Sequence, residues 1–392
     1  MRPLTVASAR PARALALPLA LPLALALLVA APPHMAHAQG RYLQTNLVSD
    51  VPGLARTLDP NLKNPWGIAL GATSPFWVAN AGTGTSTLYD GSGLKVPLTV
   101  TIPGPGGPVP SVPTGTVFNG TGGFALSNGR PPLFVFASAT GTISGWNPEA
   151  GTEAIPLVNA FGAGAAYTGI AVAGTGGDAR LYAANAGQGR IDVWDAAMNP
   201  VVGGFVDPEL PAGYVPFNVQ HAGGHVYVSY ALIDPLTGQA RAGAGNGIVT
   251  VFGVDGAFER RLATGGALDA PWGFALAPST FGRFGGALLV GNFGDGTILG
   301  YDPADGTYLG RVRGADGRAL VNEGLWGITF GNGAAGGDRD KLYFAAGING
   351  ERNGLFGSIQ TSTVPEPSTV TLLLAGLGAT FGVAARRRRQ PR

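Results

Sequence analysis

One pattern recurs six times along this 392-residue chain, and it limits the fold more than any other feature of the sequence. Each copy holds a short run that begins with a small residue, a turn, a continuous apolar run, a Gly-rich turn and a third run. Successive copies start 46 to 56 residues apart, which is typical of the four-stranded blade of a β-propeller. The copies start at Gly67, Gly123, Gly169, Asn218, Gly273 and Gly327.

The residue types within each copy favour strands. The second run is apolar on successive residues, as in FWVA from Phe76, and such a run indicates a strand buried on both faces. The first run begins with a small residue, as we expect where the innermost strands crowd a central channel. Turns such as GTG, DG and NG supply positive φ angles, and this need explains the 65 glycines.

An unmatched strand at the start of the body indicates how the ring closes. Residues 42–48 read as a strand before the first copy, whereas the last copy ends at Ile359 without a fourth run. Pairing the early strand with the last blade would leave no exposed sheet edge. The sequence therefore predicts an all-β fold, a six-bladed β-propeller closed by its N-terminal strand.

Both ends of the chain read as targeting segments. Three arginines precede an apolar run over residues 14–31, and Ala36-His37-Ala38 offers a signal-peptidase cleavage site. We therefore expect a cleavable signal peptide over residues 1–38, a propeller over 39–360 and a sorting tail over 361–392.

The tail has three parts. VPEP ends at Pro367, and Pro365 and Pro367 keep this entry extended on either side of Glu366. Residues 369–385 carry no charge and are just long enough to cross a bilayer as a helix. Four arginines follow and would stay on the cytoplasmic side: Arg386, Arg387, Arg388 and Arg389.

This layout resembles the PEP-CTERM sorting signal, which exosortases read in Gram-negative bacteria that make extracellular polysaccharide. The resemblance implies export through the inner membrane, transient anchoring, cleavage near Pro365 to Pro367, and release or transfer to the cell surface. A plain single-span anchor is the alternative.

Removing both ends changes the charge. The body keeps 17 basic and 22 acidic residues, a net charge of about −5, so we expect no nucleic-acid partner. The chain has no cysteine, so the fold must be stabilised by its core alone.

Within residues 39–360, the phrases PWGFAL and LYAANAGQGRIDVWDA resemble NHL-type repeats. The whole layout is also similar to an uncharacterised family of PEP-CTERM propeller proteins with no assigned activity.

Two repeat positions are candidates for ligand binding. Large aromatic residues stand just before the innermost strand, and asparagines end the second strand; both positions fall on the same face of a propeller. Aromatic faces beside amides suit sugars or other neutral polar ligands, although packing and turn formation would explain the same residues. The candidates are Trp66, Asn80, Asn185, Phe217, Asn218, Trp272, Asn292 and Trp326.

A metal site at the channel mouth is the alternative. Six-bladed lactonases of the gluconolactonase type hold a divalent cation with Asn, Asp and Glu side chains, and Ca²⁺ would suit such oxygens. The candidate ligands are Asn185, Asn218, Asn292 and Glu323.

No catalytic motif supports an enzyme: the sequence has no GxSxG elbow, HExxH pair or P-loop. We expect a non-enzymatic binding or structural protein, with no catalytic residue and no firmly indicated cofactor, at the cell surface or in the polysaccharide matrix. The alternatives are a metal-dependent lactonase or esterase and a protein-docking scaffold. Signal peptidase and exosortase are the expected processing partners, and a polysaccharide or a protein is the expected ligand.

Overall fold

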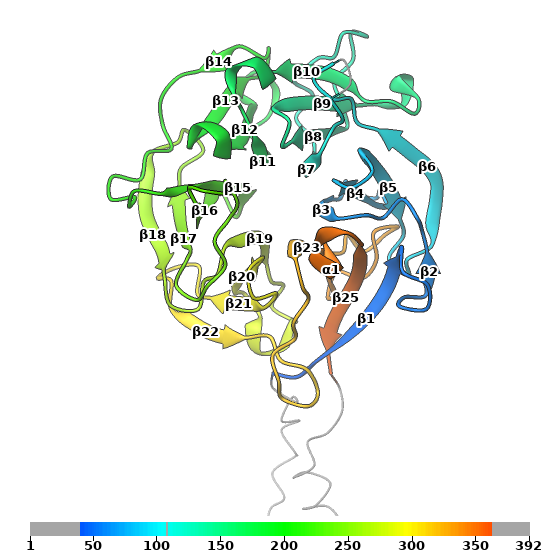
Figure 1. Ribbon diagram of the computed structural model, residues 1–392, viewed down its shortest axis with the longest axis vertical. Coiled ribbons are helices and arrows are strands. Elements are labelled where there is room, and N and C mark those ends of the chain that lie inside the picture. The colour runs from blue at the N-terminus through cyan, green and yellow to red at the C-terminus, as the bar shows by residue number, and fades with distance from the viewer. Residues whose placement is uncertain (1–39, 107–108, 363–392) are drawn as a thin grey trace, which may run out of the picture. The chain divides into compact units, whose positions relative to one another are not determined.

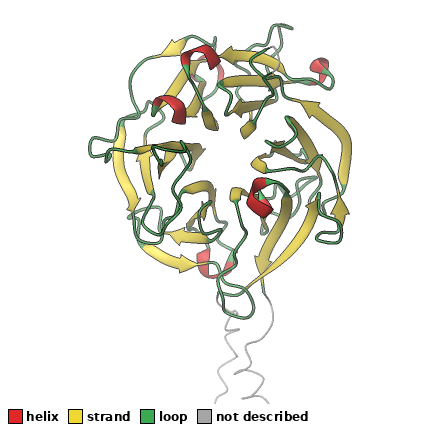
Figure 2. Ribbon diagram, viewed as in Figure 1, coloured by secondary structure: helices red, strands yellow, loops and turns green. Residues whose placement is uncertain are grey.

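The computed structural model describes residues 40–106 and 109–362. The strands of this body form six sheets arranged radially around one axis, which confirms the predicted six-bladed propeller (Figure 1). Strands and loops make up nearly all of it, and the helices are short turns (Figure 2). No helix within the described residues is long and apolar enough to span a membrane.

Blades 1 to 5 each contain four strands in chain order. Blade 1 comprises β3 (Pro65–Ala69), β4 (Phe76–Asn80), β5 (Thr85–Tyr89) and β6 (Lys95–Thr101). Blade 2 comprises β7 (Pro113–Phe118), β8 (Phe134–Ser138), β9 (Thr142–Trp146) and β10 (Ile155–Asn159). Blade 3 comprises β11 (Tyr167–Ala173), β12 (Arg180–Asn185), β13 (Arg190–Asp195) and β14 (Pro200–Val201).

Blade 4 comprises β15 (Tyr214–Ala222), β16 (His225–Leu232), β17 (Ile248–Phe252) and β18 (Phe258–Thr264). Blade 5 comprises β19 (Pro271–Leu276), β20 (Leu288–Asn292), β21 (Ile298–Tyr301) and β22 (Tyr308–Arg311). Blade 6 comprises β23 (Leu325–Phe330), β24 (Leu342–Ala346), β25 (Leu355–Thr361), β1 (Tyr42–Ser49) and β2 (Thr57–Leu58). The short helices are η1 (Pro148–Ala150), η2 (Phe161–Ala163), η3 (Gly176–Asp178), η4 (Ala186–Gln188), η5 (Gly282–Phe284) and α1 (Ile348–Glu351).

The two ends of the body close the ring, as predicted. Strand β1 pairs antiparallel with β25, from Tyr42 opposite Thr361 to Ser49 opposite Leu355. Strand β2 then adds a short parallel edge to β1. Because the first and last strands share one sheet, the final blade cannot form without both ends of the body.

The core lies between the blades. Every residue of β4, β8, β20 and β24 is buried, as the continuous apolar runs predict. Each buried Val, Leu, Ile or Phe side chain contributes about 1.5–3 kcal/mol to the hydrophobic stabilisation. Stacked blades can therefore replace the disulfides that the chain lacks.

Glycine sets the spacing of the inner strands. A Cβ at Gly273 would lie 2.4 Å from the Trp326 carbonyl oxygen of the next blade, and one at Gly327 would lie 2.6 Å from the Trp66 carbonyl oxygen. Only glycine fits such close approaches. In blade 4 the equivalent residue is Asn218, whose Nδ2 donates instead to the Trp272 carbonyl oxygen at 2.7 Å.

The prediction for the first strand of blade 2 was wrong. We predicted that it starts at Gly123, whereas the inner strand is β7, with Gly115 in the glycine position. Residues 123–126 form a loop, in which Phe124 has a φ angle of 65° and is fully buried. The apolar character of this segment reflects a loop side chain inserted between two blades.

The predicted signal peptide with Ala36 and Ala38, and the tail with Pro365, Glu366, Pro367 and Arg386 to Arg389, lie outside the described residues. Their processing stays a prediction.

Candidate functional site

A β-bulge begins the inner strand of every blade, just at the aromatic position of the repeat. A bulge inserts an extra residue and re-aims its side chain. In blades 1, 4, 5 and 6 the residue before the glycine position is aromatic, whereas blades 2 and 3 carry Thr114 and Thr168 there.

The four predicted aromatic residues meet near the propeller axis, together with Phe293. We call Trp66, Phe217, Trp272, Phe293 and Trp326 the aromatic cluster. Trp326 lies at its centre: its ring stacks on Trp66 with centroids 3.4 Å apart and on Phe293 with centroids 4.1 Å apart. Trp272 meets Trp326 edge-on at 5.7 Å, and Phe217 is tilted against it at 5.6 Å.

The three tryptophans of the cluster differ in their hydrogen bonding. Trp272 Nε1 donates to the Thr168 carbonyl oxygen at 3.0 Å, and Trp66 Nε1 donates to Asn64 Oδ1 at 3.1 Å. Trp326 is only 1% exposed, yet its Nε1 has no hydrogen-bond partner among the described residues. A buried donor without a partner costs about 1–3 kcal/mol, so this N–H calls for an explanation.

A cavity of about 620 Å³ opens beside the cluster, and we call it the mouth cavity. Every blade contributes to its lining, so it sits where the six inner strands converge. Its lining includes Trp66, Phe217, Phe293 and Trp326 of the cluster, with Asn64, Thr168, Gln239 and Glu351 as polar neighbours.

Glu351 reaches the mouth cavity from a tight turn. Asn349, Gly350 and Glu351 of α1 have φ angles of 57°, 63° and 62°, a left-handed conformation that costs energy for a residue other than glycine. The Glu323 carboxylate holds this turn by accepting hydrogen bonds from the backbone N–H groups of Asn349 and Gly350, at 3.2 and 2.8 Å. In Figure 1 this turn, labelled α1, lies between β23 and β25 beside the centre of the propeller.

The Glu351 carboxyl is largely withdrawn from water without a strong partner. Burial raises the pKa of Glu351, and weaker hydrogen bonding from the Asn64 and Trp326 side chains lowers it by less. Its Oε1 is buried and accepts no regular hydrogen bond from any residue that the structure describes. Glu351 and Trp326 thus lie close together at the mouth cavity, yet neither Glu351 Oε1 nor Trp326 Nε1 makes a hydrogen bond of regular geometry with any described residue.

The asparagines that end the second strands do not reach this cavity. Asn80, Asn185 and Asn292 are completely buried, and each uses its amide within its own blade. Asn185 Oδ1 accepts from the Ala166 and Gln188 N–H groups, and Asn292 Oδ1 accepts from the Asp269 N–H group. Asn185 and Asn292 thus hold turns, the alternative that the sequence left open, whereas Asn80 only donates, from Nδ2 to Thr87 Oγ1 at 3.0 Å.

The predicted metal ligands do not form a cation site. The oxygens of Asn185, Asn292 and Glu323 already accept backbone N–H groups, and Asn218 lines a second cavity of about 280 Å³ inside the channel. Calcium needs six to eight free oxygens around one point, so these residues do not fit it. Over residues 40–106 and 109–362, no group of three His, Asp or Glu side chains could hold a metal ion.

Sequence reasoning missed Phe293, Asn64 and Glu351. Phe293 follows a predicted residue, Asn292, and could have been found from its place at the end of β20. Asn64 and Glu351 carry no repeat signal, because they belong to irregular turns whose direction only the folded chain defines.

Comparisons with known proteins identify a sorting motif and the family to which the chain belongs. Residues 363–389 match the PEP-CTERM protein-sorting motif, which implies export, membrane-associated sorting and exosortase processing. Streptogramin B lyase has a similar structure, with a TM-score of 0.47 and 14% identity over 83% of this chain and 99% of that one. A likeness at that level carries no functional argument.

Two relatives come from Acanthamoeba polyphaga mimivirus. Uncharacterized protein R648 is 36% identical over 329 residues, which cover 80% of this chain and 78% of R648. Uncharacterized protein L690 is 35% identical over 325 residues, which cover 80% of this chain and 84% of L690. The chain therefore belongs to the family of R648 and L690.

Proposed function

We propose that this protein is a non-enzymatic binding propeller of the cell surface or extracellular matrix, whose mouth cavity takes a neutral, hydroxyl-rich ligand such as a saccharide unit of a polysaccharide. Its sorting motif implies export. Binding of such a ligand would be the role of the exported propeller.

The pair formed by Trp326 Nε1 and Glu351 Oε1 carries the proposal. One is a buried donor and the other a buried acceptor, and neither makes a hydrogen bond of regular geometry with the described residues. A hydroxyl group both accepts and donates a hydrogen bond, so one ligand hydroxyl can satisfy both atoms. A bond that involves a carboxylate is about twice as strong as one between neutral groups.

The rest of the cavity suits the same class of ligand. The partly exposed rings of Trp66 and Phe293 offer apolar faces for the C–H groups of a sugar ring, while Thr168, Gln239 and Asn64 supply further polar groups. A volume of about 620 Å³ lies within the usual range for ligand pockets. The lining carries one acidic side chain and no Lys or Arg, so an anionic ligand is disfavoured.

Binding can be tested with the purified protein and a panel of neutral methyl glycosides and oligosaccharides released from bacterial exopolysaccharides. Tryptophan fluorescence would report contact with the aromatic cluster, and calorimetry would give the affinity. We expect saturable binding that Trp326→Phe and Glu351→Gln each weaken by about tenfold, since each removes a buried hydrogen bond or its charge.

The matched control is Glu149→Gln, which makes the same chemical change at a side chain that is 57% exposed and lies in η1. It should bind like the wild-type protein. A panel without any binder, or equal affinity in all three variants, would refute the proposed ligand class.

We further propose that signal peptidase removes residues 1–38 and that exosortase cuts near Pro365 to Pro367. Intact mass of the protein from cells with an active exosortase should then correspond to residues 39 to about 364. Persistence of the full-length chain in those cells would contradict this processing.

A further inference from the structure

Positively charged side chains gather at the point where the two ends of the propeller body meet. Tyr42 pairs with Thr361, and the Ser362 N–H group donates to the Arg41 carbonyl oxygen at 2.9 Å. The matched sorting motif begins at residue 363, directly after this point. The rim of blade 6 is thus the part of the described body to which the sorting motif is joined.

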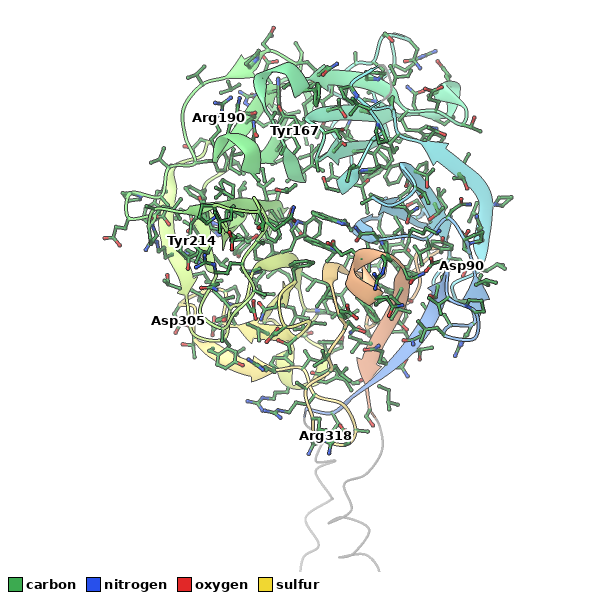
Figure 3. All side chains as sticks on the ribbon, viewed as in Figure 1. Asp90, Tyr167, Arg190, Tyr214, Asp305 and Arg318 are labelled. Atoms are coloured by element: carbon green, nitrogen blue, oxygen red, sulfur yellow. The ribbon has the colours of Figure 1, made fainter. Side chains whose placement is uncertain are left out.

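Four arginines surround this point, and we call Arg41, Arg283, Arg313 and Arg318 the rim arginines. The Arg283 side chain lies against Gly40, and a side chain at Gly317 would meet the Arg41 guanidinium. Arg313 Nη1 donates to the Gly317 carbonyl oxygen at 2.9 Å, which holds the 313–318 turn. Figure 3 shows Arg318 at the edge of the propeller where β1 begins and β25 ends.

The rim arginines are largely free of counter-charges. Arg41, Arg283 and Arg313 form no ion pair within the part of the chain that the structure describes, and Arg318 is 4.0 Å from Asp316 with its side chain 89% exposed. The neighbouring Asp340, which accepts from Thr280, lies between Arg339 and Lys341 in the sequence. This net positive region stands out because the whole body carries a net charge of about −5.

We infer that the rim arginines bind the anionic phospholipid surface of the membrane that the sorting motif engages. The apolar segment expected to cross the bilayer begins at residue 369, seven residues beyond Ser362, a reach of at most about 25 Å. A tether this short allows the rim to approach the lipid headgroups to within the screening length of about 8–10 Å at physiological salt, where the guanidinium groups would feel their charge. Binding would hold the blade 6 rim against the membrane and leave the rest of the propeller facing outward.

The test uses the full-length protein in nanodiscs of phosphatidylcholine, with or without added phosphatidylglycerol, so that the tail engages the bilayer in both. Hydrogen exchange of the amides in residues 41–43 and 313–318 reports contact at the rim. We expect exchange there to slow about fivefold or more when phosphatidylglycerol is present. The protection should disappear at 1 M salt, where the screening length falls to about 3 Å.

Two triple variants distinguish the rim arginines from other exposed arginines. The triple variant Arg283→Gln, Arg313→Gln and Arg318→Gln should lose the protection. A control triple variant at exposed arginines on other blades or turns, Arg130→Gln, Arg241→Gln and Arg352→Gln, should keep it. Equal exchange in both kinds of nanodisc would overturn the inference. Protection by soluble alginate in place of phosphatidylglycerol would overturn it as well, by assigning the rim to an acidic polysaccharide.

Discussion

The pKa values of two carboxyl groups of this propeller, the buried Asp207 and the half-buried Glu351, are shifted in opposite directions. Asp207 accepts two hydrogen bonds from Arg261, at 2.7 and 2.8 Å, and one from Thr250 at 2.8 Å. Burial works to raise the pKa of Asp207, but these hydrogen bonds outweigh it and hold the pKa below its usual range. For Glu351 burial wins and the pKa is raised. The pairing of Asp207 stabilises the fold, whereas Glu351 lines the mouth cavity with one oxygen that accepts no regular hydrogen bond from the described residues.

The largest effect is expected for Asp207→Ala, which should lower the free energy of unfolding by about 3–5 kcal/mol. The substitution leaves the Arg261 guanidinium, only 19% exposed, without its main partner. Chemical denaturation measures the change. Glu149→Ala at the surface should stay within about 0.5 kcal/mol of the wild-type value. A similar loss in both variants would contradict the structural role of Asp207.

The second contrast lies within the aromatic cluster. Trp272→Phe removes a hydrogen bond and leaves the Thr168 carbonyl oxygen without its donor, whereas Trp326→Phe removes an N–H that has no partner. Both lose the same volume, so Trp272→Phe should cost about 1 kcal/mol more stability. Urea denaturation of the two variants compares them directly. Equal losses would mean that the Trp326 N–H is satisfied in the folded protein.

Glu351→Gln should leave stability at neutral pH unchanged or raise it by up to about 1 kcal/mol. The substitution removes a charge that burial disfavours and keeps the size of the side chain. Thermal unfolding at pH 7 measures the difference. Strong destabilisation would show that the turn around α1 needs the carboxylate.

The pH dependence of stability should differ in sign between the two carboxyl groups. The pKa of Asp207 is lowered by folding, so its contribution is present above the ordinary carboxyl pKa and is lost as the pH falls through its folded value. The pKa of Glu351 is raised by folding, so its contribution is present at low pH and is lost as the pH rises through its folded value.

Melting temperatures from pH 3 to pH 8 would separate the contributions of Asp207 and Glu351 to stability. Asp207→Asn should remove part of the loss of stability on the acid side, and Glu351→Gln should remove part of the decline on the neutral side. Curves of unchanged shape in both variants would contradict the assigned pKa directions.

The repeats predicted most of the fold. Continuous apolar runs located the second strands, and the unmatched strand at residues 42–48 predicted the closure by β1. Blade 2 shows the limit of this reasoning. Strand β7 carries Thr116 directly after its glycine, where the other copies carry Ile, Val or Phe, and the Thr114 hydroxyl donates to the Tyr167 carbonyl oxygen. The buried loop residue Phe124 gave a stronger apolar signal than the strand itself.

The candidate site could be predicted only in part. Trp66, Phe217, Trp272 and Trp326 recur at one place in the repeat, so their meeting at the axis follows from the six-fold arrangement. Glu351 could not be placed in this way, because three successive left-handed residues aim it at the mouth cavity. Nor does sequence reveal which N–H or oxygen atoms remain unpaired after folding.

The most direct test of the proposed site is a double-mutant cycle on the affinity for the tightest-binding glycoside of the panel, with Trp326→Phe, Glu351→Gln and the combined variant. If one ligand hydroxyl joins the two groups, either substitution removes most of the same interaction. Each single variant should bind the glycoside about tenfold more weakly than the wild-type protein. The double variant should then bind only slightly more weakly than either single variant. Losses that simply multiply, or an affinity that none of the substitutions changes, would contradict a shared hydroxyl at the mouth cavity.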